Sequence, residues 1–171
     1  MTDIEDQLRR LHDEYGEFPV TEETVEVPRS AYMDCLRAAE RDELGGARIL
    51  LEDEGQVLLI RYEDDPKAWD IPGGSRERRE SHAAAARRHV AEQVGLECEL
   101  NDVFRALVYR FTLIEGEEGV AGLWLLFEGT PHQGDLDLGE GILEARWFEN
   151  VPEAVDPHVK SRAETAAESD D

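Results

Sequence analysis

The sequence predicts an α/β fold in which a mixed β-sheet lies between helices, with a helical extension at the N-terminus. Short apolar runs flank one alanine-rich helical stretch at 81–94, and another helical segment follows the last run, as expected for a sheet covered by helices. The length of 171 residues fits one domain of ordinary size. We expect the helical extension at 1–45, the main domain at 46–162 and a disordered acidic tail at 163–171.

The N-terminal extension contains two predicted helices. Residues 3–15 place Ile4, Leu8 and Leu11 on one helical face, and a glycine and a proline follow. A second helix is expected from about 28 to 42, with proline in its first turn. We find no pattern that carries chemistry in these helices. We therefore expect them to pack on the main domain or on a second subunit, which leaves a homodimer open.

From Ala47 the apolar residues follow the period of strands. Asp53-Glu54-Gly55 separates two apolar runs and predicts a β-hairpin. A last helical piece is expected to begin at about Asn150. Further strands are expected near 97–114, 120–129 and 144–148.

The charge of the chain is strongly negative. Forty-one Asp and Glu against 18 Lys and Arg give a net charge of -23, and the acidic residues are spread along the whole chain. Lysine occurs only at Lys67 and Lys160. This composition resembles proteins of halophilic archaea that accumulate salt, and the alternative is an acidic protein of ordinary salinity. Because no basic stripe is present, duplex nucleic acid and anionic membranes are disfavoured as partners.

The cysteines and the apolar runs indicate the compartment. Cys35 and Cys98 are too few for a disulfide framework and lack the spacing of a metal site, so we expect free thiols. The N-terminal residues lack a signal-peptide pattern, and the longest apolar run, 120–127, is too short to span a bilayer. The sequence therefore predicts a soluble, cytoplasmic protein.

One segment, WDIPGGSRERRESHAAAARRHVAEQVGL, has glycine and charged residues at fixed spacing. Gly74 is followed after five residues by Glu80 and after seven more by Arg88, and then come Glu92 and Gly95. This pattern resembles the signature of the Nudix hydrolases: Gly, five residues, Glu, seven residues, Arg-Glu, an aliphatic residue, any residue, Glu-Glu, any residue, Gly and an aliphatic residue. The resemblance implies a Nudix-type α/β/α sandwich with a mixed β-sheet, behind the N-terminal helical extension.

Two positions depart from that pattern. On a helix capped by Ser81, positions 89, 92 and 93 lie on one side, where three carboxylates would hold Mg²⁺ beside a diphosphate. Here those positions are His89, Glu92 and Gln93, so one carboxylate of three remains. We expect a weakened site for Mg²⁺ or Mn²⁺, since imidazole suits Mn²⁺, Ni²⁺ or Zn²⁺ better than Mg²⁺. The candidate metal ligands are Glu92, the Gly74 carbonyl, Glu80, Gln93 and, from the loop before the last strand, Glu140.

The resemblance implies metal-dependent hydrolysis of a nucleoside diphosphate linked to another moiety, so the partner is a small nucleotide derivative. It gives catalytic roles to Glu92 as metal ligand and to Arg88 as its orienting residue. His89 stands where the family has a glutamate, and it is a candidate proton acceptor because imidazole can accept a proton near neutral pH. Gly73 and Gly74 in the turn and Arg61 before it are the candidates for substrate binding.

Simpler interpretations stand beside these roles. Arg88 can pair with Glu92 across one helical turn, and Arg61 can pair with a surface acid. The altered signature segment, residues 74–96, is called the Nudix box below. It is compatible with a hydrolase that still works slowly, with a nucleotide-binding sensor that does not cleave, or with a changed metal or chemistry. A subunit that uses the fold only as an interface is a further alternative.

We expect the melting temperature to rise when KCl is raised from about 0.1 M to about 2 M, because the screening length falls from about 10 Å to below about 3 Å. Shorter screening relieves the repulsion within a chain of net charge -23. Circular dichroism during heating measures this change, and a melting temperature that falls or stays constant would contradict it.

Overall fold

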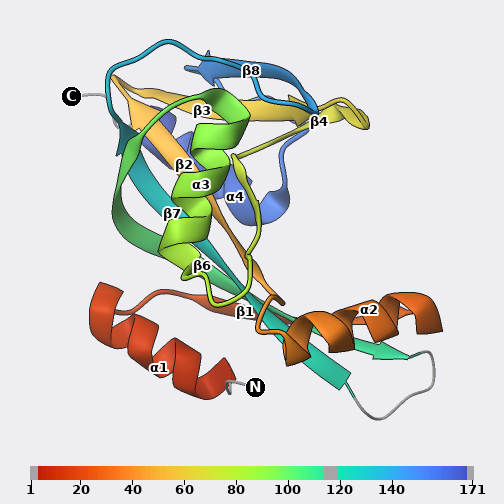
Figure 1. Cartoon of the computed structure of the whole chain (residues 1–171). Coiled ribbons are helices and arrows are strands. Elements are labelled where there is room, and N and C mark those ends of the chain that lie inside the picture. The colour runs from red at the N-terminus through yellow and green to blue at the C-terminus, as the bar shows by residue number, and fades with distance from the viewer. Residues whose placement is uncertain (1–3, 114–118, 169–171) are drawn as a thin grey trace.

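The computed structural model describes residues 4–113 and 119–168, which form one mixed α/β fold (Figure 1). In chain order the elements are α1 (Ile4–Tyr15), β1 (Val20–Val27), α2 (Arg29–Glu40), β2 (Gly46–Asp53), β3 (Gln56–Tyr62), β4 (Asp65–Asp70), β5 (Gly73–Ser75), α3 (His82–Val94), β6 (Cys98–Leu113), β7 (Gly119–Pro131), β8 (Ile142–Phe148) and α4 (Pro157–Glu168).

The strands form a sheet in the order β1-β6-β7-β2-β3-β4, in which β5 also pairs with β2 and β8 with β3. The pairs β1–β6 and β2–β7 are parallel and the other pairs are antiparallel, so the mixed sheet is confirmed. Strand β2 joins two halves of the sheet. It pairs with β7 over residues 46–51 and with β3 only at 52–53, and the start of β2 pairs instead with the short β5.

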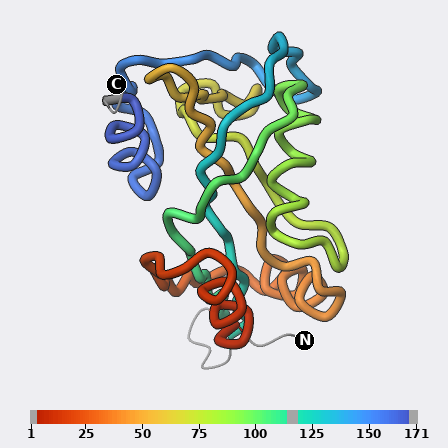
Figure 2. Tube along the Cα trace, turned by 90° about the vertical axis from the view of Figure 1, so that its left-hand side faces the viewer, coloured from red at the N-terminus to blue at the C-terminus, as the bar shows by residue number. Residues whose placement is uncertain are grey.

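Helices α3 and α4 cover opposite sides of the strands (Figure 2). Side chains of β2 alternate between these sides, since Ile49 packs in the cluster with α3 and Leu50 in the cluster with α4. The predicted α/β/α arrangement is therefore confirmed. The buried residues of α3 on this interface are Ala85, Ala86, Val90 and Val94.

The N-terminal extension is not only helical. Both predicted helices are present, but between them lies β1, which the sequence analysis did not predict and which pairs in parallel with β6. Its sequence, VTEETVEV, is rich in β-branched residues that favour strands. The extension therefore adds an edge strand to the sheet of the main domain.

The C-terminal prediction needs correction. The last helix begins at Pro157 rather than near Asn150, and the carboxylate of Asp156 accepts a hydrogen bond of 2.8 Å from the His158 amide in its first turn. The helix continues through residues 163–168, which were expected to be disordered, because alanines in this stretch are buried against the sheet. The rest of the predicted tail, 169–171, lies outside the described residues.

We expect Ala86→Leu to lower the free energy of unfolding by about 1–3 kcal/mol, because the added methylenes must enter a packed interface. Ala86 has 0% exposure between α3 and the sheet, whereas Ala84 on the same helix is exposed. The matched variant Ala84→Leu should therefore change stability by less than about 0.5 kcal/mol. Denaturant titration in molar KCl measures both values, and equal losses would show that Ala86 is not a packing position.

Candidate functional site

The turn that contains the two glycines lies directly against α3. Ser81 caps α3 by accepting a 3.1 Å hydrogen bond from the Ala84 amide, and Gly95 ends it in the left-handed conformation at φ 72°. A Cβ on Gly74 would lie 2.7 Å from the His89 ring, so only glycine allows this approach. The structure thus brings the predicted glycine turn and the predicted helix together.

Arg88 connects α3 to the segment before it. Its guanidinium donates to both carboxylate oxygens of Glu80, from Nε at 2.8 Å and Nη2 at 3.0 Å, and Nη2 also donates to the Ser75 carbonyl at 3.0 Å. These charge-assisted bonds hold the pKa of Glu80 below its ordinary value. The expected pair with Glu92 is present but longer, at 3.4 Å. The main partner of Arg88 is therefore Glu80.

His89 binds the same turn. Its Nε2 lies 2.8 Å from the Ser75 carbonyl oxygen. Because a carbonyl only accepts, this contact requires the proton on Nε2, which then cannot receive another one. Only Nδ1 of the neutral ring is left as an acceptor.

Gln93 makes a two-way hydrogen bond with Gly73. Its Oε1 accepts from the Gly73 amide at 3.0 Å, and its Nε2 donates to the Gly73 carbonyl at 3.0 Å. The Nε2 also lies 3.4 Å from the Tyr62 hydroxyl, which itself donates to the Gly73 carbonyl at 3.3 Å. A carboxylate could replace only the accepting half of this pair.

A pocket of about 200 Å³ lies on the α4 side of the sheet. We call it the α4 pocket. Arg48 connects it to the turn, since Nη1 donates to the Ile71 carbonyl at 2.8 Å and to the Tyr62 hydroxyl at 3.3 Å. Arg48 also pairs with Asp70 at 3.3 Å, and burial raises the pKa of that carboxyl. The pocket is lined by Arg48, Asp70, Leu107, Tyr109, Trp124, Leu126, Asp156, His158 and Val159.

The amino-acid sequence alone did not predict this pocket. Its lining residues come from β2, β4, β6, β7 and the start of α4, so no local spacing connects them. One signal was present: Arg48 is the only charged residue among residues 46–51 of β2. Trp124 is half-buried and packs edge-to-face on Tyr109 at 5.3 Å between ring centroids.

A profile of the family described as NUDIX domain matches residues 45–168, which is most of the chain. The chain belongs to the Nudix family. The Nudix box observed above is therefore a family feature, and the family match begins where the N-terminal extension ends.

Solved Nudix structures share the fold. A NUDIX hydrolase from Nitrosomonas europaea is 20% identical with a TM-score of 0.57, covering 74% of this chain and 72% of its own. A MutT protein from Methanosarcina mazei Go1 is 21% identical with a TM-score of 0.55, covering 72% of this chain and 91% of its own. Among curated proteins, none matches the chain by sequence.

A third structure also matches the N-terminal extension. The crystal structure of a UDP-X diphosphatase is 14% identical with a TM-score of 0.55, and it covers 98% of this chain and 70% of its own. At this identity the likeness concerns the fold. The match therefore extends over the N-terminal extension of this chain as well as its Nudix domain.

The Nudix box of this chain does not present a fitting set of metal ligands. Glu80 is held by Arg88, Gln93 and His89 are bonded to the turn, and Glu92 is 60% exposed with Arg88 as its nearest cation. Glu140 is exposed in the loop before β8, whose Gly139 amide bonds to the carbonyl of Gln93 at 2.9 Å. Over residues 4–113 and 119–168, no three His, Cys, Asp or Glu side chains are close enough together to hold a metal ion.

Arg61 makes its contacts away from the turn at residues 72–75, which we call the Nudix turn. It pairs with Glu144 on β8, donates to the Pro66 carbonyl at 2.8 Å and stacks 4.7 Å from the ring centroid of Trp69. In the described structure none of its contacts reaches Gly73 or Gly74, so substrate binding by Arg61 stays a prediction.

In the same described ranges, no helix has the length and apolar character needed to cross a membrane.

We expect Gln93→Glu to lower the free energy of unfolding at pH 7 by about 1–3 kcal/mol, because a carboxylate removes the 3.0 Å donor to the Gly73 carbonyl, which keeps only the longer 3.3 Å bond from the Tyr62 hydroxyl. The neighbouring variant Glu92→Gln alters an exposed side chain and should cost less than about 0.5 kcal/mol. Denaturant titration compares the two. Equal effects would mean that the bond between Gln93 and the turn does not stabilise the fold.

Proposed function

We propose that this chain binds a nucleoside diphosphate derivative across the α4 pocket and the Nudix turn, and that its metal-dependent hydrolysis is much weaker than the box would otherwise support. One observation carries the proposal: the side chains at two of the three carboxylate positions, His89 and Gln93, are hydrogen-bonded to the turn itself. They hold the turn in shape, and they are not arranged as ligands around an ion.

The α4 pocket supports the binding half of the proposal. The half-buried rings of Trp124 and Tyr109 offer an apolar wall against which a base can stack. The carboxylates of Asp70 and Asp156 can accept hydrogen bonds from a base or a ribose. Arg48, between this pocket and the turn, would face the diphosphate.

A slow hydrolase is the second candidate, favoured by membership of the Nudix family and by the exposure of Glu92. In this case Glu92 and Glu140 would hold Mg²⁺ or Mn²⁺, with His89 accepting a proton at Nδ1. A divalent ion there would neutralise phosphate charge and activate water.

The acidic composition supports a further proposal, that the protein works in a salt-rich cytoplasm.

The test measures calorimetric binding of ADP-ribose and UDP-glucose, and release of phosphate-containing products, in molar KCl with Mg²⁺ or Mn²⁺. We expect the native chain to bind at least one of them with little turnover. The double variant His89→Glu with Gln93→Glu should release product at least about tenfold faster, since each restored charge strengthens metal binding.

Adding Glu92→Gln to the double variant is the control and should abolish the gain. Circular dichroism establishes that each variant is folded. Rapid turnover by the native chain, no faster in the double variant, would favour the hydrolase and defeat the proposal. Absence of binding to every nucleotide tried would defeat both candidates.

A further inference from the structure

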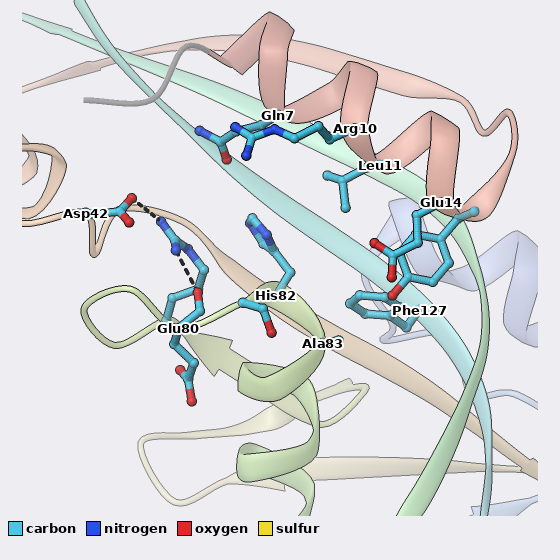
Figure 3. Close-up of a pocket in the computed structure, with 12 residues that line it drawn as sticks. Gln7, Arg10, Leu11, Glu14, Asp42, Glu80, His82, Ala83 and Phe127 are labelled. Carbon is cyan, nitrogen blue, oxygen red and sulfur yellow. Dashed lines mark hydrogen bonds and ion pairs between the residues drawn. The ribbon is translucent and has the colours of Figure 1, made fainter.

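Pockets on the two sides of the sheet differ in how their charged groups are partnered. On the α3 side, a pocket of about 330 Å³ lies between α1 and the start of α3 (Figure 3). Its charges offset one another, since Arg76 pairs with Asp42 at 3.3 Å and Arg10 shares the lining with Glu14. The α4 pocket on the other side has no such balance.

Asp70 and Asp156 both line the α4 pocket, and they differ in their partners. Both oxygens of Asp70 are in use, since Oδ1 accepts from the Ile71 amide at 2.8 Å and Oδ2 pairs with Arg48 at 3.3 Å. Asp156 accepts from the His158 amide at 2.8 Å through Oδ1. Within the described ranges its Oδ2 has neither a hydrogen bond nor an ion pair. Asp156 therefore offers a free carboxylate oxygen.

The two basic side chains of the α4 pocket are paired with other acids. Arg48 is balanced by Asp70, and His158 Nε2 lies 3.2 Å from an oxygen of Glu23 on β1. The charge of Asp156 is therefore not compensated, and it attracts hydrogen-bond donors into the pocket.

The Asp156 carboxylate acts on the interior of the pocket. Burial chiefly raises the pKa of Asp70 and of Tyr109, and the nearby negative charge of Asp156 raises both further. These two residues lie on β4 and β6, whereas Asp156 directly precedes α4. A carboxylate that affects both of them faces the space that the three elements enclose.

The aromatic wall does not by itself distinguish one base from another. Trp124 and Tyr109 offer ring surfaces, and every nucleobase has a face that can stack on them. The volume of about 200 Å³ is below that of a complete ligand pocket, so it fits one part of a nucleotide, such as its base. Discrimination between bases therefore depends on the polar groups that meet the edge of the base.

We infer that the α4 pocket selects nucleobases that present an exocyclic amino group, such as adenine or cytosine, and that Asp156 Oδ2 accepts from this group. This selectivity rests on the proposed binding of a nucleoside diphosphate derivative and specifies which derivative is preferred. An amino group donates to the carboxylate, whereas uracil and hypoxanthine have a carbonyl at that position, whose oxygen the carboxylate repels.

Two pairs of nucleotides test this selectivity, CDP against UDP and ADP against inosine diphosphate, because the members of a pair carry the same charge. Calorimetry with the full chain in molar KCl and Mg²⁺ measures each affinity. The indole N–H resonance of Trp124 reports whether the ligand occupies the α4 pocket. We expect the amino-bearing member of at least one pair to shift this resonance and to bind about fivefold more tightly, as one added hydrogen bond allows.

Asp156→Asn should abolish or reverse the preference. The His158 amide needs an acceptor, so the Asn carbonyl oxygen takes the place of Oδ1 and the NH₂ group takes the place of Oδ2. The free position then donates, which favours a base with a carbonyl there. Because Asn caps helices about as well as Asp does, the fold should be retained, and circular dichroism verifies this.

Glu153→Gln is the matched control. It removes the same charge three residues earlier, from a side chain that is 99% exposed and does not line the pocket. Any general effect of charge on anionic nucleotides appears in both variants, but Glu153→Gln should keep the affinity ratio of each pair within about twofold of the native ratio.

The selectivity is refuted if Asp156→Asn keeps the native ratio, or if binding leaves the Trp124 resonance unshifted. Equal affinities within both pairs, as expected if Asp156 accepted from the ribose instead, would also refute it but leave the proposed nucleotide binding intact. Absence of binding by all four nucleotides would defeat the proposed function and the selectivity together.

Discussion

The two-way hydrogen bond between Gln93 and Gly73 holds α3 and the Nudix turn together, and the rest of the site depends on it. It satisfies both backbone groups of a glycine whose φ of 150° is outside the range of other residues, in a position where a Cβ would meet Arg48 and the Ala47 carbonyl. Since β5 pairs with the start of β2, this bond also ties α3 to the centre of the sheet. An amide can do this because it donates and accepts at the same time.

The same bond explains why the fold of the family can persist with an altered box. In a box with three glutamates, mutual repulsion among the carboxylates opposes the close approach of helix and turn unless a cation offsets it. Here an amide and an imidazole contact the turn directly, and the carboxylates of Glu80 and Glu92 are paired with Arg88. Hydrogen bonds within the protein thus hold α3 against the Nudix turn.

The sequence alone predicted those features that local chemistry decides. Ser81 and Gly95 marked the ends of α3 correctly, because a cap and a left-handed residue act within one turn. Strand β1 was missed because its glutamates obscured the β-branched residues, and it is stabilised by pairing with β6, 86 residues away by register. The bonding direction of Gln93 and the lining of the α4 pocket depend on contacts between distant elements, which spacing does not reveal.

Arginine, rather than lysine, holds the loop that contains the Nudix turn. Arg48 donates to the Ile71 carbonyl, Arg88 to the Ser75 carbonyl and Arg76 to the Glu80 carbonyl, so three arginines secure the chain at intervals before α3. Each of these arginines also pairs with a carboxylate at the same time. The planar guanidinium of arginine allows this because it has several N–H donors in a fixed arrangement, whereas the compact ammonium of lysine does not. In so acidic a chain, carboxylates are available everywhere as second partners. The near absence of lysine therefore has a structural consequence, because the cations that remain are those able to bind the backbone and an acid together.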